Sequence, residues 1–377
     1  FLLAFSVCGM VPIEDSATDS NSIVIQLPTG MDYVSRKTGA KHLGAASFSW
    51  HGELVGEQKG FLSFAKVSGV FHGSLSLTGG VFYSINGKAG NLSIAESTSF
   101  KKKGCGVCAV AKSGSSLPPD PRMAAQPAKS WRNGDANLID LLVVYPSVVT
   151  TEVGGITEVE ALIAGAVSDS NLAYSNSLVP LQLRVVHTVE INYTPTGFLD
   201  TELSRLQNTN DGYFDEVHDL RDQYGADLVC MLTTDSDAGG LASTMTHPSM
   251  SFESSGFNVN VWNQLGAPNY TLAHEIGHNM GCLHNREDST WDSGYEFSAF
   301  SFGKRWIENG LGYGTIMAYD TTDSKYPNTI PFFSNPGVTY LTTATGNPGT
   351  EDNAKVLGLS APYVSNFRDA VIQEIVP

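Results

Sequence analysis

The stretch HEIGHNMGCLH, from His274 to His284, says more about fold and chemistry than any other part of the chain. His274 and His278 are four residues apart, so on a helix their side chains project from one face, one turn apart. Gly281 can adopt the left-handed backbone that ends a helix, which lets His284 return to the same point. Three imidazoles on one ion leave a fourth position open for water, so the spacing predicts a catalytic zinc site. Glu275, between the first two histidines, is placed to reach that water.

Context strengthens this interpretation. The short pattern HExxH occurs by chance on many helices, whereas HExxHxxGxxH fixes five positions, including a glycine with a backbone role. Downstream, in YGTIMAYD, Met317 lies in a short apolar turn and Tyr319 stands two residues later. Met317 by itself would be ordinary core, and its meaning comes from following the zinc motif.

The long zinc motif followed by a methionine turn resembles the metzincin metallopeptidases. The resemblance covers about residues 138–368 and implies that the three histidines bind zinc, that Glu275 is the general base and that Met317 forms an apolar floor beneath them. The order of elements and the segment FFSNP look most similar to bacterial-type reprolysin relatives, including the peptidyl-Asp metallopeptidases. Asn285 follows the third histidine where reprolysins usually have Asp. Tyr319 is placed as in astacins and serralysins, where the tyrosine can ligate zinc or stabilise the oxyanion.

The pattern from Leu138 onwards predicts an α/β domain, and the resemblance implies an α/β (α+β) metzincin-type catalytic domain with a twisted, mostly parallel sheet. LIDLLVVY is a continuous apolar run, as expected of a strand covered on both faces. The order β-α-β-α-β follows, and then the zinc helix from about Tyr270 to Met280. We expect strands at 138–145, 181–191 and 227–234, and helices at 156–177, 199–207, 212–225 and 352–371.

The chain divides into four parts. Residues 1–19 contain FLLAFSVCGM, which looks like the end of a signal-peptide core, with a first buried strand as the alternative. Residues 20–110 alternate apolar and polar positions between glycine-containing turns, which predicts a β-rich prodomain built as a meander or small sandwich. Residues 111–136 have the composition of an exposed linker where proteases cut, and residues 137–377 form the peptidase-like domain. In the β-rich part, His42, His51 and His72 are interpreted as solvated or satisfied residues and not as ligands.

Five cysteines are present, Cys8, Cys105, Cys108, Cys230 and Cys282. Cys105 begins a CGV string that resembles metzincin cysteine switches, which implies an inhibitory propeptide whose thiolate takes the open position on zinc. The lysines before it favour the thiolate. A Cys105–Cys108 disulfide and a separate metal site remain open alternatives, and the pairing of the other cysteines is not readable from the sequence.

Composition limits the possible partners. The net charge of -16 comes without a basic patch, which argues against nucleic acid. No apolar run reaches the roughly 18 residues of a membrane span. We expect a secreted, monomeric zinc metalloendopeptidase, made as a latent zymogen, that acts on protein or peptide substrates lying along an edge strand near residues 239–245. Calcium is compatible with the superfamily, but no calcium loop is defined.

The sequence leaves two alternative functions open. A non-catalytic, zinc-stabilised surface or adhesion module would have no need of Glu275, which speaks against it. The second alternative keeps the peptidase but makes the β-rich region a permanent targeting module.

Overall fold

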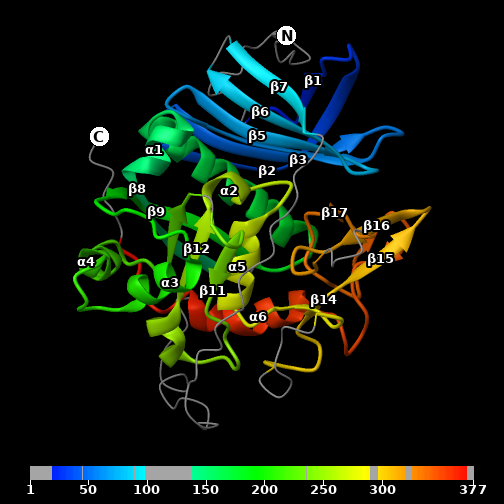
Figure 1. The fold of residues 1–377 in the computed structure, drawn as a ribbon. Coiled ribbons are helices and arrows are strands. Elements are labelled where there is room, and N and C mark those ends of the chain that lie inside the picture. The colour runs from blue at the N-terminus through cyan, green and yellow to red at the C-terminus, as the bar shows by residue number, and fades with distance from the viewer. Residues whose placement is uncertain are drawn as a thin grey trace.

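The computed structural model describes residues 19–44, 46–88, 91–97, 137–234, 236–288, 296–319 and 325–371. Figure 1 shows an N-terminal sheet stacked on one side of a mixed α/β body, with helix α2 (Ile156–Asn176) directly beneath the sheet. The two parts are therefore in contact through one face of the sheet and one helix.

The N-terminal region is a single antiparallel sheet of seven strands in chain order. Of the two predicted forms, a meander and a small sandwich, the structure has the meander. Large apolar side chains alternate onto one face, where Trp50, Phe64 and Phe71 form the centre of a cluster of their own. The opposite face packs on α2. The strands are β1 (Ser22–Gln26), β2 (Asp32–Gly44), β3 (Ser47–Val55), β4 (Gly60–Val67), β5 (Val70–Leu77), β6 (Val81–Lys88) and β7 (Asn91–Ser97).

The body is organised by a five-stranded sheet in the order β11-β12-β10-β8-β9. The strands are β8 (Asn137–Pro146), β9 (Leu181–Ile191), β10 (Leu228–Thr233), β11 (Gly240–Ala242) and β12 (Phe257–Val261). Four of them run parallel, and β11 pairs with β12 in the antiparallel direction at the edge. This arrangement confirms the predicted mixed α/β class with a mostly parallel sheet.

Helices cover both faces of this sheet, as the apolar run of β8 predicted. Leu141 and Val143 point into a cluster shared with α2, α5 and α6, whereas Leu142 and Val144 point into a second cluster shared with α3 and α4. The helices are α1 (Ser147–Val153), α2, α3 (Leu199–Gln207), α4 (Asp215–Tyr224), α5 (Thr271–Asn279) and α6 (Asn353–Val364), with short 3-10 turns η3 (Met250–Ser255) and η4 (Trp262–Gln264).

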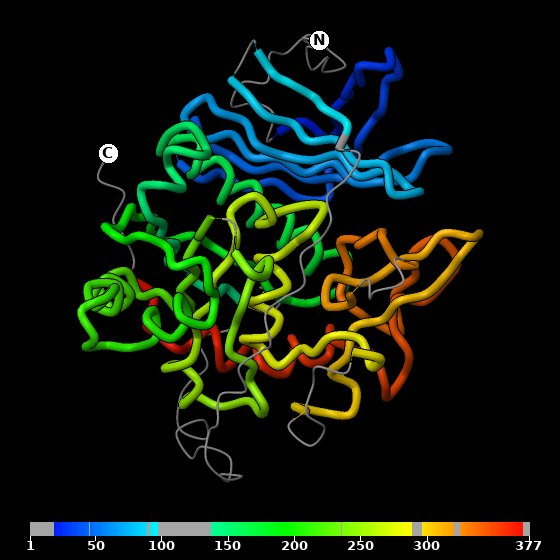
Figure 2. The backbone as a smooth tube through the Cα atoms, in the orientation of Figure 1, coloured from blue at the N-terminus to red at the C-terminus, as the bar shows by residue number. Residues whose placement is uncertain are grey.

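After α5 the chain forms several small sheets, which Figure 2 shows beside the body, with one hairpin projecting from it. Their strands are β13 (Leu283–Asn285), β14 (Phe302–Gly303), β15 (Arg305–Glu308), β16 (Leu311–Gly314), β17 (Asn328–Thr329), β18 (Thr339–Tyr340) and β19 (Thr343–Ala344). Phe61 of β4 packs edge-on against Phe332, with ring centroids 5.7 Å apart. The N-terminal sheet therefore contacts this part of the body as well as α2.

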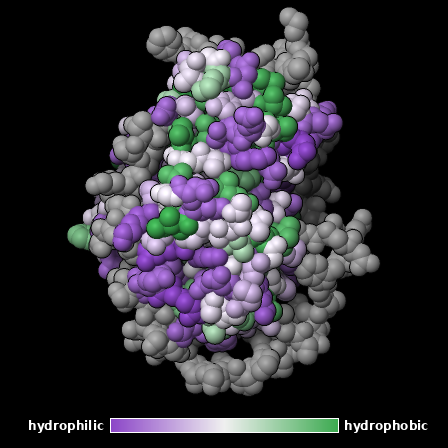
Figure 3. Space-filling model, turned by 90° about the vertical axis from the view of Figure 1, so that its right-hand side faces the viewer, coloured by the Kyte–Doolittle hydropathy of each residue, from purple (hydrophilic) through white to green (hydrophobic). Residues whose placement is uncertain are grey.

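Hydrophilic and hydrophobic residues alternate in small groups over the coloured part of the face in Figure 3. Among the described residues, none of the helices is long and apolar enough to cross a membrane.

Candidate metal centre

Helix α5 lies in the interior, and all of its residues are buried. Its bounds are within one residue of those predicted at each end. Beyond it, Gly281 has a φ of +94°, and a Cβ there would lie 2.5 Å from the Phe297 ring and 3.0 Å from the Met245 carbonyl oxygen. Both the backbone conformation and the space therefore require glycine. The turn at this glycine leads directly into β13, which carries His284.

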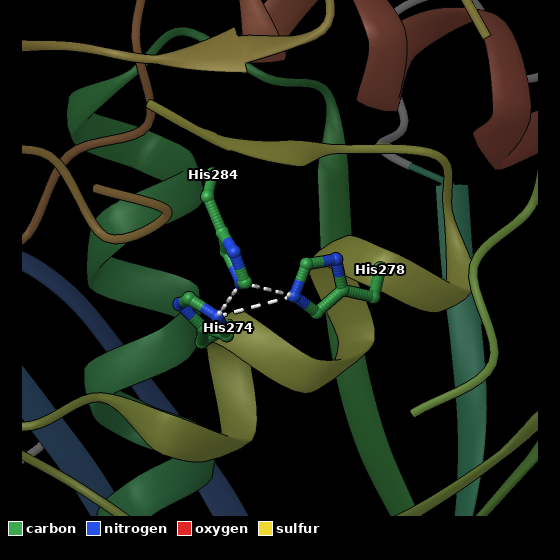
Figure 4. A group of neighbouring side chains, drawn as sticks. All are labelled: His274, His278 and His284. Atoms are coloured by element: carbon green, nitrogen blue, oxygen red, sulfur yellow. Dashed lines mark hydrogen bonds between the residues drawn. The ribbon is translucent and has the colours of Figure 1, made fainter. Parts of the chain in front are cut away.

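The three histidines of the motif converge on one point (Figure 4). The Nε2 atoms of His274 and His278 are 3.2 Å apart, and His284 Nε2 lies 3.2 Å and 3.0 Å from them. A tetrahedral zinc ion with bonds of about 2.0–2.1 Å requires ligand nitrogens roughly 3.3 Å apart. The donor set and its spacing therefore fit zinc.

The other ring nitrogen of each histidine meets an acceptor. His274 Nδ1 lies 2.9 Å from the Ile316 carbonyl oxygen, and His278 Nδ1 lies 2.9 Å from that of Cys282. His284 Nδ1 lies 2.5 Å from Asp288 Oδ2. An acceptor at Nδ1 keeps the proton there and leaves the Nε2 lone pair free for a metal. All three rings are thus prepared as ligands through Nε2.

Asp288 was not foreseen from the sequence. Its side chain is 9% exposed, and its carboxylate faces His284 from a turn that follows β13. An acidic residue four positions after a histidine is a useful signal on a helix, but here the chain passes from a strand into a turn. Asn285, which departs from the reprolysin pattern, has a structural role here. Its Oδ1 accepts a 2.9 Å hydrogen bond from the Tyr319 amide, which ties the third histidine's strand to the methionine turn.

Met317 is fully buried beneath α5. A Cβ added to Gly277, between the first two histidines, would lie 2.6 Å from Met317 Sδ. A Cβ on Gly303 of β14 would lie 3.1 Å from Met317 Cβ. The sulfur therefore lies directly against the backbone of the helix that carries the histidines, in the place expected of an apolar floor.

Tyr319 packs against two of the histidines. Its ring centroid lies 4.0 Å from that of His284, with the planes at 45°, and 5.5 Å from that of His274, with the planes at 20°. The tyrosine is therefore close enough to the centre to take part in its chemistry.

Glu275 is fully buried on α5, and the edge strand β11 runs beside it. A Cβ on Gly240 would lie 2.6 Å from Glu275 Oε1, so this strand approaches the carboxylate closely because it has glycine there. The centre thus combines three imidazoles, one carboxylate and an adjacent strand at the edge of the sheet.

Comparison with known proteins agrees with this geometry. Residues 135–333 match the reprolysin-type group of metallo-peptidase family M12. The chain belongs to this family. The match confirms the predicted resemblance to reprolysin-like metallopeptidases.

Three relatives of this M12 chain carry the name peptidyl-Asp metalloendopeptidase. That of Stenotrophomonas maltophilia is 35% identical over 63% of this chain and 54% of its own length. The relative from Xanthomonas campestris is 32% identical over 67% of this chain and 56% of its own length. The relative from Pseudomonas fragi is 30% identical over 53% of this chain and 100% of its own length. The chain thus spans about half the length of the first two. A solved structure titled "Structure of a chaperone-substrate complex" covers 78% of this chain and 40% of its own, with 17% identity and a TM-score of 0.47, which is too weak a likeness to support an argument.

Two cysteines of the M12 domain lie near the centre without joining it. Cys230 and Cys282 are buried and are not joined in a disulfide. Burial raises the pKa of Cys230 to about 12 and that of Cys282 well above its usual value, so both remain protonated thiols at neutral pH. Cys8, Cys105 and Cys108 lie outside the described residues, as do the leader up to residue 18 and the linker 111–136.

Within the described ranges, the triad is the one group of three or more His, Cys, Asp or Glu side chains close enough to share a metal ion. A calcium site therefore gains no support from these residues.

Proposed function

We propose that this chain is a metzincin-type zinc metalloendopeptidase that hydrolyses peptide bonds in proteins or peptides. The observation that carries the proposal is the convergence of His274, His278 and His284 through Nε2 beside a buried glutamate. When bound, zinc polarises a carbonyl group and lowers the pKa of a coordinated water towards about 7. The family match supports the same activity.

The side chains then have separate tasks. Glu275 takes the proton of the attacking water and delivers it to the leaving amine. Tyr319, packed against His284, stabilises the charge that develops on the scissile oxygen. Met317 supports the helix from below, and Asp288 holds the third imidazole in its tautomer.

The substrate lies in an extended pose along β11, because this strand is at the edge of the sheet among the described residues and passes next to Glu275. The name that the relatives share supports a further point of specificity, cleavage beside an aspartate of the substrate.

The protein is also proposed to be secreted as a latent zymogen. Residues 20–110 would be the propeptide, residues 111–136 the cleavage zone and residues 137–377 the peptidase, with the Cys105 thiolate as an additional zinc ligand in the latent form. The separate apolar cluster of the N-terminal sheet supports this division, because a propeptide that is cut off needs a core of its own.

Exchange of Glu275 for glutamine tests the activity. The Glu275→Gln protein should bind zinc in a one-to-one ratio but lose peptide hydrolysis by several orders of magnitude. The measurement pairs metal content with turnover of two matched fluorogenic peptides, one with Asp and one with Asn. Near wild-type turnover would remove Glu275 from the mechanism. Zinc binding without hydrolysis by the activated wild-type protein would favour the adhesion module. Equal turnover of the two peptides would leave the peptidase standing and reject the aspartate preference.

A further inference from the structure

The face of the N-terminal sheet that contacts the body combines apolar side chains, including Phe61 and Phe82, with a larger set of polar ones, whereas the opposite face is mainly apolar. The side chains that point towards the body include Ser49, His51, Ser63, His72, Ser74 and Ser76. Ser63 Oγ donates to Ser168 Oγ on α2 at 3.1 Å, and Ser74 Oγ donates to Asp169 Oδ1 at 3.5 Å. Contacts between parts that separate are more polar than permanent ones. The interface has that character around Ser168 and Asp169 of α2, and it is apolar where Phe61 meets Phe332.

The interface is also incompletely packed. A cavity of about 350 Å³ lies between strands β2 and β3 and the elements α2 and β9, and His51 lines it. A second cavity, of about 280 Å³, lies between strands β5 and β6 and the helices α1 and α2, and His72 lines it. Each cavity is large enough to admit water. The first is lined largely by polar groups, and the second, although mainly apolar, contains Lys88, Glu152 and Glu158 beside His72. Protons can therefore reach both histidines while the sheet is docked.

The hydrogen-bond partner of His51 is a neutral hydroxyl group. The Nδ1 atom of His51 lies 3.0 Å from the Thr38 hydroxyl, and Gly39 packs so closely on the ring that a Cβ would lie 2.4 Å from it. Burial lowers the pKa of His51 to about 4. The charged and polar groups that face this end are Lys41 of β2, Glu53 of β3, Ser168, Asn171 and Ser175 of α2, Gln182 of β9, and the Arg184–Asp140 ion pair of β9 and β8.

His72 lies against α2, where a Cβ on Gly165 would be 2.7 Å from its ring. Burial lowers the pKa of His72 to about 4, although a hydrogen bond with Asn86 acts in the opposite direction. The charged groups at this end are Lys88 of β6, which pairs with Glu158 of α2 at 3.2 Å, and Glu152 of α1. The two carboxylates therefore line the cavity without keeping the imidazole protonated.

We propose that His51 and His72 form an acid-sensitive latch, in which protonation of both imidazoles loosens the N-terminal sheet from the peptidase body. The sheet docks when both rings are neutral, because a neutral ring loses little hydration in the interface. A protonated ring is better solvated after separation, so acid shifts the equilibrium towards the open state. The latch concerns docking alone and does not depend on zinc or on the proposed catalysis.

The direction and size of the pH effect on docking follow from the pKa values of the groups in the interface. A histidine with a pKa of about 6.5 when separated and about 4 when docked weakens docking by roughly 30-fold between pH 7.5 and pH 5. Asp169 opposes this effect, because burial raises its pKa to about 6 and its protonated form favours docking at low pH by up to about 10-fold. Two histidines against one aspartate leave a net weakening of docking of up to roughly 100-fold, which develops progressively as the pH falls from 6.5 to 4.

The test uses the full chain with a site-specific cleavage sequence placed within residues 111–136, in a Glu275→Gln background that prevents self-digestion. The chain is folded, cut once, and diluted at pH 7.5 and at pH 5, and sedimentation velocity gives the dissociation constant of the two parts. The constant should rise by 10- to 100-fold at pH 5. The double variant His51→Gln and His72→Gln should lose this rise and bind up to about 10-fold more tightly at pH 5, because Asp169 then acts alone.

His42→Gln is the matched control, because His42 lies exposed on β2 of the same sheet and should leave the pH dependence unchanged. Circular dichroism at pH 7.5 checks that each variant is folded. If the double variant does not fold, the single variants His51→Gln and His72→Gln replace it. The latch is refuted if the constant changes less than 3-fold with pH, if the parts separate already at pH 7.5, or if the histidine variants keep the wild-type rise.

Discussion

Replacement of Asp288 by asparagine should weaken zinc binding by about 10- to 100-fold, or about 1.4–2.7 kcal/mol. The carboxylate lies 2.5 Å from His284 Nδ1, and the two side chains are 9% and 7% exposed, so water screens this contact little. Asparagine has nearly the same shape as aspartate, and its amide oxygen can still accept a hydrogen bond from His284 Nδ1. The substitution therefore removes the negative charge but keeps a neutral hydrogen bond. The loss should therefore come from the lower basicity of Nε2 and not from a collapsed site.

The assay is competition for zinc against a fluorescent chelator at pH 7.5. Glu287→Gln is the matched control, because this neighbouring carboxylate is 62% exposed and pairs with Arg305 and not with a histidine. Peptide hydrolysis by Asp288→Asn should largely recover at saturating zinc, since Glu275 and the other ligands are intact. Wild-type zinc affinity in Asp288→Asn, or an equal loss in Glu287→Gln, would refute the reasoning.

Three further predictions follow from named contacts. Tyr319→Phe should lower kcat by roughly 10- to 1000-fold with little change in KM, and an unchanged kcat in steady-state kinetics would mean that the ring only packs on His284. Gly281→Ala should destabilise the protein by more than about 1 kcal/mol in urea unfolding, whereas Gly358→Ala in α6, which has open space and an ordinary φ, should not. Cys105→Ser should give a precursor that is active or cleaves itself without an activator; electrophoresis detects this, and a precursor that stays latent would count against the switch.

Local patterns predicted the centre well, because its residues are close in sequence. Four-residue spacing on a helix fixes a common face, and a glycine at the helix end fixes where the chain can turn, so α5 and Gly281 follow from chemistry within a few residues. The apolar run of β8 likewise predicted a strand covered on both faces. In each case the information lies in a single stretch of chain.

The remaining parts of the centre depend on contacts between distant segments. Ile316 reaches His274 from 42 residues away, and Gly240 meets Glu275 only because β11 reverses direction at the sheet edge. Alternation in the N-terminal strands predicted two different faces, but it did not say which face would meet α2 or whether the strands would form one sheet. Those choices are made by tertiary packing, which no single stretch encodes.

Buried histidines occur in two chemical settings in this chain, and the hydrogen-bond partner of the ring separates them. In the zinc centre the partner is a carbonyl oxygen or a carboxylate, so Nδ1 keeps its proton and Nε2 remains a strong ligand. At the interface His51 meets a hydroxyl and His72 an amide, which are neutral groups that do little to stabilise an added proton. Burial then decides the protonation state there. The same side chain thus serves to hold a cation in one place and to register acidity in the other.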